Sequence, residues 1–172
     1  MNLTTKALIV TAALALAACQ NPRGGMDAGF GAGAGGVGGP GGIGMTELGD
    51  PNDPGSIAHF NERVGDRVFF ETDQSSLTQL AQDTLRRQAV WLTQNPQYQI
   101  LIEGHADERG TREYNVALGA RRANAVESFL IQQGVTASRL RTTSYGKERP
   151  VEACPEARCW NQNRRAVTVL AR

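Results

Sequence analysis

Apolar residues recur with two different periods after about residue 57, and each change of period marks a boundary between predicted elements. Ile100 and Ile102 alternate with their neighbours, which is the period of two that a strand needs. Further short apolar runs predict strands at 68–70, 140–145 and 166–170. Between them, apolar residues at helical spacing predict one helix over about 77–94 and a second from about Glu113 to Gln133.

The residues at the ends of these segments support the same division. Ser76 to Gln79 fits a capping box at the start of the first helix, and Asn95-Pro96 ends it. Gly134 predicts a glycine C-cap for the second helix. The order β-α-β-α-β-β predicts an α/β fold of the two-layer α+β type, with the helices on one face of the sheet. The pattern alone does not give the order of the strands.

The second helix carries an arginine on its apolar side. At about 100° per residue, Arg122 falls inside the apolar stripe and Arg121 lies toward its edge, while Asn115 shares the side of Arg122. A buried arginine is costly unless an anion meets it. We therefore expect Arg122 to meet an acid from the charged loop at 105–112 or the carboxylate of a ligand. The predicted stripe consists of Tyr114, Leu118, Ala125 and Phe129.

The N-terminus has the pattern of a secretory signal. Lys6 precedes an apolar run over residues 7–18, which is shorter than the about 20 residues that a membrane-spanning helix needs. The ending Leu-Ala-Ala-Cys resembles a bacterial lipobox, in which Cys19 is lipidated and becomes the first mature residue. Gln20 follows, not the aspartate associated with inner-membrane retention, so we expect an outer-membrane lipid anchor with the domain in the periplasm.

Composition divides the rest of the chain into a tether and one domain. Glycine dominates residues 24–44, so residues 19–56 are expected to form a lipidated, flexible tether after the signal peptide at 1–18. The glycines do not form a phosphate loop, because no Gly-Lys-Ser/Thr follows them. Residues 57–172 have the size of one domain. The formal net charge of +1 gives no indication of nucleic-acid binding.

Cys154 and Cys159 remain after Cys19 is assigned to the lipid. They lie five residues apart in a polar segment between two predicted strands. Because an exported protein is in an oxidising compartment, we expect a small-loop disulfide. A zinc site is the alternative, but two thiolates without nearby histidines supply too few ligands, so no metal and no cofactor other than the lipid is expected.

Several motifs then point to a family. The run Gly-His-Ala-Asp-Glu-Arg-Gly-Thr at 104–111 is followed by Tyr-Asn, Leu-Gly and Arg-Arg-Ala-Asn-Ala-Val, and later by Ser-Tyr-Gly-Lys-Glu-Arg-Pro at 144–150 and Asn-Arg-Arg-Ala-Val at 163–167. This series resembles the OmpA-like peptidoglycan-binding domains, and among them the peptidoglycan-associated lipoproteins. The resemblance covers roughly residues 57–172 and implies a mixed four-stranded sheet.

The resemblance implies a ligand, the diaminopimelate side chain of peptidoglycan stem peptides, which ends in an ammonium and a carboxylate. The residues of this chain that match the family motif are Asp107, which the resemblance implies binds the ammonium, and Arg122, which it implies binds the carboxylate. The planar guanidinium of arginine can donate two parallel hydrogen bonds to a carboxylate. Thr72 stands where relatives usually have phenylalanine, which leaves one apolar wall of the pocket open to question. The weaker expected site residues are Thr72, Asp73, Ala106, Asn115 and Leu118.

Other interpretations of the same residues remain open. Asp107 and Arg122 could form only a structural salt bridge, and Asn163 to Arg165 could face a glycan or protein partner or simply cap the last strand. Glu103, Asp107 and Glu108 could form a glycosidase pair, but a carboxylate beside arginine should stay ionised, so no enzymatic activity is expected. The resemblance also implies TolB and other Tol proteins as partners, and a docking module acting mainly through TolB is the alternative function.

Overall fold

The computed structural model describes residues 48–172, and the expected signal peptide, Cys19 and most of the expected tether lie outside this range. Its two long helices are α3 (Gln79–Gln94) and α4 (Arg112–Gln132), and its strands are β1 (Arg67–Phe69), β2 (Gln99–His105), β3 (Leu140–Gly146) and β4 (Arg165–Ala171). Shorter helical segments are α2 (Ile57–His59), the π-helical turn η1 (Phe60–Gly65), the 3-10 turn η2 (Ala137–Arg139) and α5 (Ala157–Asn163).

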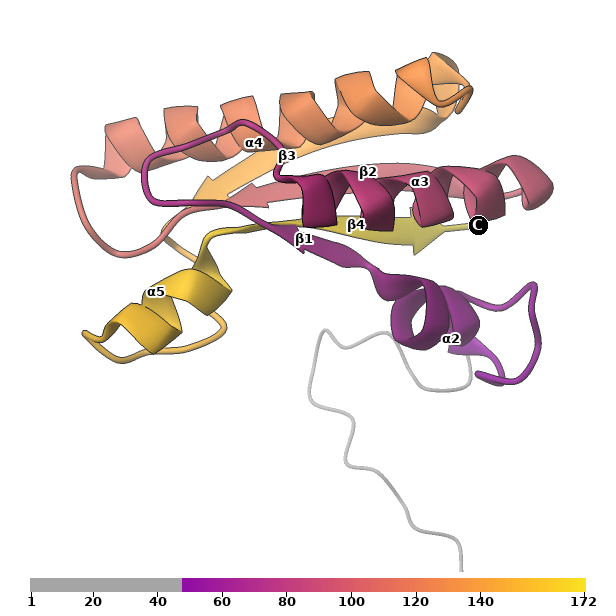
Figure 1. Cartoon of the computed structure of the whole chain (residues 1–172), viewed down its shortest axis with the longest axis horizontal. Coiled ribbons are helices and arrows are strands. Elements are labelled where there is room, and N and C mark those ends of the chain that lie inside the picture. Colours follow the sequence, from indigo (N-terminus) through magenta and orange to yellow (C-terminus); the bar gives the residue numbers. More distant parts are fainter. Residues whose placement is uncertain (1–47) are drawn as a thin grey trace, which may run out of the picture. The chain divides into compact units, whose positions relative to one another are not determined.

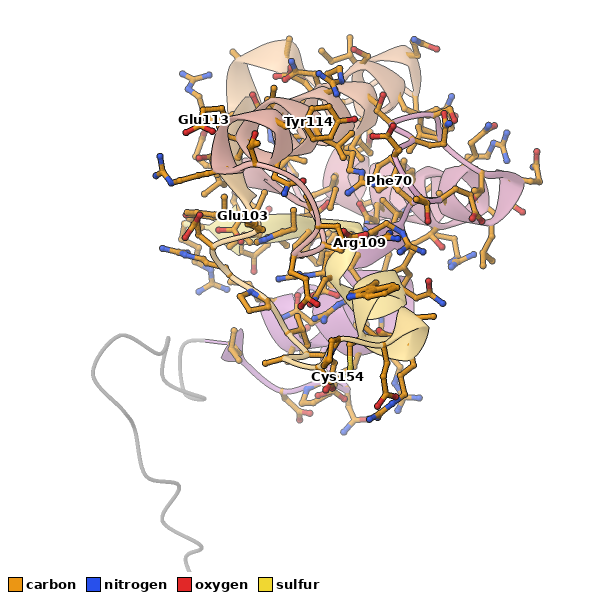
Figure 2. The ribbon with its side chains drawn as sticks, turned by 90° about the vertical axis from the view of Figure 1, so that its left-hand side faces the viewer. Phe70, Glu103, Arg109, Glu113, Tyr114 and Cys154 are labelled. Carbon is orange, nitrogen blue, oxygen red and sulfur yellow. A yellow bond between two sulfur atoms is a disulfide. The ribbon has the colours of Figure 1, made fainter. Side chains whose placement is uncertain are left out.

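The four strands form one mixed sheet in the order β1-β4-β2-β3. β4 is antiparallel to both β1 and β2, whereas β2 and β3 are parallel and are joined through α4. The predicted two-layer α+β fold with a mixed four-stranded sheet is therefore confirmed. The two predicted helices, α3 and α4, lie on the same face of the sheet as expected, and the short helix α5, which the sequence did not predict, lies apart from them (Figures 1 and 2).

One face of the sheet carries the core. Alternate residues of the two central strands, among them Ile100, Ile102 and Leu170, are buried against α3 and α4, which contribute Leu85, Leu92, Val126 and Leu130. The strand residues between them, such as Leu101 and Val169, are only partly covered. Because burial of apolar area is the main favourable term in folding, the helix-covered face supplies most of the stability.

Packing of the chain onto the domain begins earlier than the expected boundary at residue 57. The indole N–H of Trp91 donates to the carbonyl of Pro54 at 2.7 Å, and the hydroxyl of Tyr98 donates to the carbonyl of Gly55 at 2.8 Å. The ring of Phe60 packs 4.9 Å from that of Trp91. Hydrogen bonds from the indole N–H and the phenol hydroxyl to loop carbonyls leave no periodic pattern in the sequence. The spacing of apolar residues therefore did not indicate that the domain begins before residue 57.

The predicted C-terminal cap of α4 agrees with the structure, whereas the predicted N-terminal cap of α3 does not. Gly134 has φ +95° after α4, and its neighbour Val135 donates to the carbonyl of Leu130, so the predicted glycine C-cap is confirmed. The predicted start of the first helix is wrong. Thr78, not Ser76, caps α3 by accepting a hydrogen bond from the amide of Ala81 at 3.2 Å.

The apolar stripe of α4 also lies slightly off its predicted position. Arg122 is fully buried and Arg121 is exposed, as predicted, but Tyr114 is 43 % exposed and Phe129 is only partly buried. The stripe is centred on small and polar residues because the helix backbone approaches β2 and β3 closely. The buried positions of α4 are Asn115, Leu118, Gly119, Arg122, Ala123, Val126 and Leu130. None of the helices between residues 48 and 172 combines the length and apolar character that crossing a bilayer requires.

Candidate functional site

A cleft of about 280 Å³ opens where β2 ends and α4 begins. The loop after β1 forms one side, and the loop from Ala106 to Thr111 together with the first turns of α4 forms the other. Thr111 caps α4 by accepting from the amide of Tyr114 at 3.2 Å, and Gly110, with φ +89°, makes the turn that aims the helix N-terminus at the cleft. The lining residues are Thr72, Asp73, Asp107, Arg109, Gly110, Tyr114, Asn115 and Leu118.

Five of the residues expected from the sequence therefore meet in one cleft, although they come from three separate segments. Thr72 and Asp73 follow β1, Asp107 follows β2, and Asn115 and Leu118 lie on α4. Two expected residues, Ala106 and Arg122, do not line it. Three residues that the sequence reasoning left out, Arg109, Gly110 and Tyr114, do.

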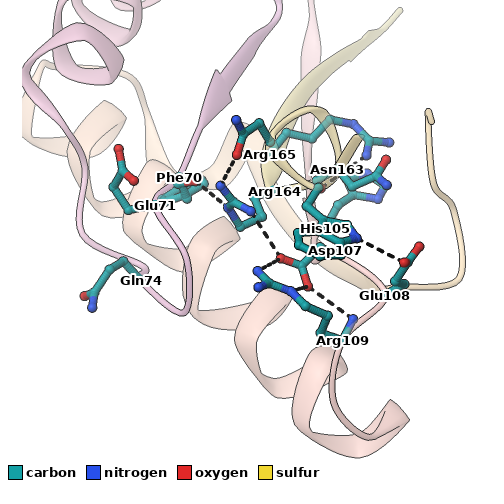
Figure 3. Close-up of polar contacts among 12 residues, drawn as sticks. Phe70, Glu71, Gln74, His105, Asp107, Glu108, Arg109, Asn163, Arg164 and Arg165 are labelled. Atoms are coloured by element: carbon teal, nitrogen blue, oxygen red, sulfur yellow. Dashed lines mark hydrogen bonds and ion pairs between the residues drawn. The ribbon is translucent and has the colours of Figure 1, made fainter. Parts of the chain in front are cut away.

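Asp107 is the centre of an ion-pair network, not the partner of Arg122. Arg109 donates to it from its backbone N–H at 3.2 Å, from Nε at 3.1 Å and from Nη2 at 2.7 Å, and Arg164 donates from Nη1 at 3.3 Å. Figure 3 shows both arginines converging on this carboxylate. Burial alone would raise the pKa of Asp107, but these hydrogen bonds and charges outweigh it, and the net pKa lies below the ordinary value.

An ionised Asp107 cannot act as the general acid of a glycosidase near neutral pH. In the described part of the chain, no three His, Cys, Asp or Glu side chains are arranged to hold a metal ion. The cleft presents fixed charges and hydrogen-bonding groups.

Arg122 does not line the cleft and instead hydrogen-bonds three backbone carbonyls next to it. It is fully buried, and it donates from Nε to the carbonyl of Gln74 at 2.9 Å, from Nη1 to that of His105 at 2.7 Å and from Nη2 to that of Glu71 at 3.2 Å. Burial and the nearby Arg164 lower the pKa of Arg122 to about 10, so it remains charged at neutral pH. The buried arginine thus ties the loop after β1 to the end of β2, and the alternative of an Asp107–Arg122 salt bridge is wrong.

Asp73 and Tyr114 close one end of the cleft. The Tyr114 hydroxyl donates to the Asp73 carboxylate, linking the loop after β1 to the first turn of α4. Asp73 has φ 60°, a left-handed conformation that aspartate tolerates better than most residues. Among the described residues, Tyr114 is the one hydrogen-bond partner of the Asp73 side chain, so this exposed carboxylate keeps most of its acceptor capacity.

The segment between β3 and β4 also supports the site, which the sequence did not indicate. Trp160 of α5 donates its indole N–H to the Glu108 carboxylate at 3.0 Å, and its ring lies 4.3 Å from the guanidinium of Arg109. Lys147 donates to the carbonyls of Glu108 and Gly110 at 3.2 and 2.7 Å. The loop carrying Asp107 is therefore held from both sides.

The residues at the end of this segment are structural. Arg164 bonds Asp107, the carbonyl of Phe70 and the side chain of Asn161, while Asn163 accepts from the amides of Val151 and Glu152. Arg165 is buried and donates to the carbonyls of Asn163 and Arg149. The interpretation in which these side chains face a glycan or a protein partner is therefore not supported by their burial. Cys154 and Cys159, for which the sequence predicts a disulfide, are joined with their Cα atoms 5.8 Å apart.

Comparison with known proteins gives consistent matches in sequence. The model of the OmpA family matches residues 69–164. The peptidoglycan-associated lipoprotein of Agrobacterium fabrum is 54 % identical over 163 residues, which are 95 % of this chain and 85 % of that protein. The protein of the same name from Mesorhizobium japonicum is 63 % identical over 118 residues, covering 69 % of this chain and 70 % of that one.

Solved structures agree with the fold. The crystal structure of the peptidoglycan-associated lipoprotein from Burkholderia pseudomallei superposes with a TM-score of 0.63 at 41 % identity, covering 71 % of this chain and all of that one. The C-terminal domain of Helicobacter pylori MotB gives a TM-score of 0.59 at 24 % identity over 62 % of this chain and 84 % of that one, a likeness of fold alone.

Proposed function

Because this chain belongs to the OmpA family, we propose that its folded domain binds peptidoglycan non-covalently and that the whole chain links the outer membrane to the cell wall. Relatives that share most of its length carry the name peptidoglycan-associated lipoprotein. The charged cleft at the start of α4 is the site that we assign to this binding. It recognises its ligand and carries out no chemistry on it.

The ligand that suits the cleft is the end of a diaminopimelate side chain. This group is a zwitterion, with an ammonium and a carboxylate on one carbon, so its site must present a fixed anion and a fixed cation close together. The cleft carries the carboxylates of Asp73 and Asp107 and the guanidinium of Arg109, and Leu118 adds an apolar lining residue for the aliphatic chain. This combination of both charge signs in one small cleft is the observation that carries the proposal.

The family resemblance assigns the ammonium to Asp107 and the carboxylate to Arg122. Arg122 spends one N–H of each terminal nitrogen on a backbone carbonyl, and because each of these nitrogens carries two, one on each is left over. The helix N-terminus at Thr111 adds backbone N–H groups and a partial positive charge for a ligand carboxylate. Asn115 and Leu118 lie on the same side of α4 and line the cleft.

A pull-down on purified sacculi tests this function. The wild-type domain should sediment with sacculi without releasing muropeptides, and Asp73→Asn should lower the bound fraction. Asp83→Asn is the matched control, because it removes the same charge from an exposed position on α3 outside the cleft. A wild-type domain that washes through would contradict wall binding, and released muropeptides would identify an enzyme.

The anchor is a second part of the proposal. We assign the lipid to Cys19, residues 1–18 to the signal peptide and the glycine-rich residues after Cys19 to a tether between the membrane and the wall. One acyl chain gives only reversible membrane binding, whereas a multiply acylated cysteine is a durable anchor. Cys19→Ala should release the protein into the soluble periplasmic fraction. Persistence of that variant in the outer-membrane fraction would contradict lipid anchoring at this position.

A role in the Tol-Pal system, with TolB as a partner, completes the proposal and is supported by the family resemblance alone. Competition is the test. If TolB uses a surface that overlaps the cleft, soluble TolB should displace the domain from sacculi in a concentration-dependent way. Retention of the domain by immobilised TolB together with no retention by sacculi would favour the docking module instead.

A further inference from the structure

One edge of the sheet is open beside α3. β1 is the outer strand in the order β1-β4-β2-β3, and β4 pairs with one side of it. The Asp66 carbonyl accepts a hydrogen bond from β4 at 2.7 Å, and the Phe70 amide donates to the residue before β4 at 2.9 Å. Since successive strand residues direct their backbone groups to opposite sides, those of Arg67 and Phe69 face away from β4.

Four backbone groups are therefore left on the outer side of β1, the N–H and C=O of Arg67 and of Phe69. In the part of the chain that the structure describes, none of the four has a hydrogen-bond partner. A row of unpaired N–H and C=O groups on a strand edge is a template for the backbone of another chain. A segment lying beside β1 in extended form satisfies two donors and two acceptors at once.

A groove of about 170 Å³ runs along this edge. Residues of β1 form one wall, and Leu80, Ala81 and Thr84 of α3 form the other. The groove adjoins a second hollow of about 260 Å³, since Phe69, Thr78 and Leu80 line both. Figure 1 shows β1 beside α3. The unpaired edge of the sheet therefore faces a groove between a strand and a helix.

The two walls of this groove carry exposed apolar side chains. Leu80 is 75 % exposed, more than any other large apolar side chain within residues 48–172, and Phe69 is 40 % exposed. Neither side chain belongs to the hydrophobic core. Exposed apolar side chains gathered in one place are typical of a surface that binds another molecule.

The charges of the groove indicate which kind of segment fits. Arg67 is the one charged side chain among the residues that line the 170 Å³ groove, and Asp66 accepts from its guanidinium at 2.7 and 2.9 Å. The charge of Arg67 is thus already balanced. A charged residue pointing into the groove would lose water without gaining a partner, so the matching segment is uncharged and apolar on that side.

The length of the edge favours a peptide segment over a second copy of this chain. The three residues of β1 span only about 10 Å. A stable interface between two folded domains buries about 1,200 Å² or more, which needs a larger surface. Strand addition of a peptide needs a short edge for the main-chain hydrogen bonds and pockets for alternate side chains.

We propose that β1 and α3 form a docking groove for an extended, uncharged segment of another protein, which adds to β1 as a fifth strand of the sheet. The main chain of the segment bonds Arg67 and Phe69, and its alternate apolar side chains pack against Phe69 and Leu80. None of these three residues lines the cleft assigned to wall binding. The docking groove is therefore a second site, and it does not depend on the proposed function.

The test uses the capped peptide acetyl-Thr-Val-Thr-Val-Thr-amide as the probe. Its matched control has the same sequence with every backbone nitrogen methylated, which keeps the side chains and removes the N–H donors. Binding to the chain from Gln20 to Arg172 is followed by NMR titration up to millimolar peptide. The unmodified peptide should shift the amide signals of β1 and the first turns of α3 and slow amide exchange at Arg67 and Phe69 at least about fivefold.

The methylated peptide should produce neither effect. Equal binding of the two peptides would show that the main chain takes no part, and no binding of the unmodified peptide at millimolar concentration would show that the edge does not accept a strand. Either result would overturn the proposal.

Two variants of Phe69 separate the main chain from the side chain. Phe69→Pro removes the N–H that faces the groove, at a position where a strand edge tolerates proline, whereas Phe69→Ala removes the same ring and keeps the N–H. Phe69→Pro should bind the peptide at least about threefold more weakly than Phe69→Ala. Equal binding by two folded variants would overturn strand addition.

Leu80→Ser tests the groove without a change in the sheet, and so decides the matter if Phe69→Pro does not fold. It should weaken peptide binding at least about threefold. Val90→Ser is the matched control, because Val90 is another exposed apolar residue of α3 and lies outside the groove. It should change binding less than about twofold, and equal losses in the two variants would overturn the assignment of the groove.

The free chain shows whether another occupant is present. If exchange at Arg67 and Phe69 is slow and depends on protein concentration, with a dimer in sedimentation, the occupant is a second copy. If exchange is slow at every concentration, another part of the same chain pairs with β1. Both results would overturn the proposal of a separate partner, and fast exchange without peptide would support it.

Wall binding is read separately. Leu80→Ser should sediment with sacculi to the same extent as the wild type, because Leu80 does not line the cleft. A parallel loss of peptide binding and sacculus binding in this variant would overturn the assignment of two separate sites. A wild type that binds the peptide but not sacculi would contradict the proposed function alone.

Discussion

Gly104 of β2 and Gly119 of α4 meet backbone to backbone. A Cβ placed on Gly104 would lie 1.9 Å from the carbonyl oxygen of Gly119, and one placed on Gly119 would lie 2.8 Å from the carbonyl oxygen of Gly104. Both neighbours are backbone atoms, which cannot move without shifting the strand or the helix. This contact sets the distance between α4 and the sheet immediately beside the cleft.

Gly104→Ala should therefore destabilise the domain by at least about 2 kcal/mol, because a side chain forced into a packed site displaces its surroundings. Urea unfolding followed by circular dichroism measures the change. Gly55→Ala is the control, since a Cβ there meets its neighbours at an ordinary 3.6 Å and the residue is not in a left-handed conformation. Equal midpoints for Gly104→Ala and the wild type would show that the helix and strand are less tightly packed than described.

The second prediction concerns the contribution of Arg122 to stability. Arg122→Ala removes the partner of three backbone carbonyls and leaves a cavity, so the free energy of unfolding should fall by about 3 kcal/mol or more. The exposed neighbour gives the control: Arg121→Ala should change stability by less than about 0.5 kcal/mol. Thermal melting of the two variants side by side is the measurement.

Wall binding by Arg122→Ala has to be compared with the melting temperature of the same variant. A loss of wall binding in Arg122→Ala with a lowered melting temperature would reflect the loosened loop at 71–74 as much as a lost ligand contact. Unchanged melting in Arg122→Ala would contradict the role of Arg122 in holding this loop, and a loss of wall binding in that variant would then be assigned to a lost ligand contact.

Local periodicity predicted the elements, and the motif series predicted five of the residues that meet in the cleft. Both long helices, all four strands and the burial of Arg122 but not Arg121 follow from spacing, since burial on one face imposes a period. The mixed sheet and the meeting of Thr72, Asp73, Asp107, Asn115 and Leu118 required the family resemblance, because no pattern in one sequence specifies how distant segments pair.

The parts that could not be predicted depend on single long-range contacts of polar side chains. Arg109 could not be identified as a cleft residue from the sequence, because nothing near it in the sequence indicates Trp160, with which it stacks. α3 starts at Gln79 because Thr78 caps it, and Arg122 holds the loop that precedes this cap through the carbonyls of Glu71 and Gln74. The same applies to the turns at Pro54 and Gly55, which Trp91 and Tyr98 bind.

The surroundings of His105 should make the stability of the domain depend on pH. It is buried on the face of the sheet opposite the core, 3.6 Å from the Glu103 carboxylate and beside the ring of Tyr145, and within residues 48–172 neither ring nitrogen has a hydrogen-bond partner. Burial, together with the positive charges of Arg165 and Arg149, lowers the pKa of His105 to about 4.

The sign follows from the lowered pKa. The ordinary pKa of a histidine is 6.5, so in the unfolded chain His105 takes up a proton as the pH falls below 6.5. In the folded domain it does not accept this proton until the pH approaches 4. Stability is therefore lost as the pH falls from 6.5 toward 4, by about 2 kcal/mol from this residue at pH 5. In His105→Phe, which keeps a ring, the loss between pH 7.5 and pH 5 in urea unfolding should be smaller by about that amount. An equal loss in both proteins would mean that His105 is protonated in the folded domain.

The disulfide between Cys154 and Cys159 closes a loop of few residues, so its contribution should be small, about 2 kcal/mol in the chain-entropy account. Reduction, or the double substitution Cys154→Ser with Cys159→Ala, should lower the melting temperature moderately and leave the sheet folded; alanine is chosen at 159 because that side chain is buried. The larger effect should be local. α5 follows the first cysteine and carries Trp160, whose indole bonds Glu108, so amide exchange over residues 107–111 should accelerate on reduction while exchange in β2 and β4 stays slow. Uniform acceleration across the sheet would show instead that this loop holds the fold together.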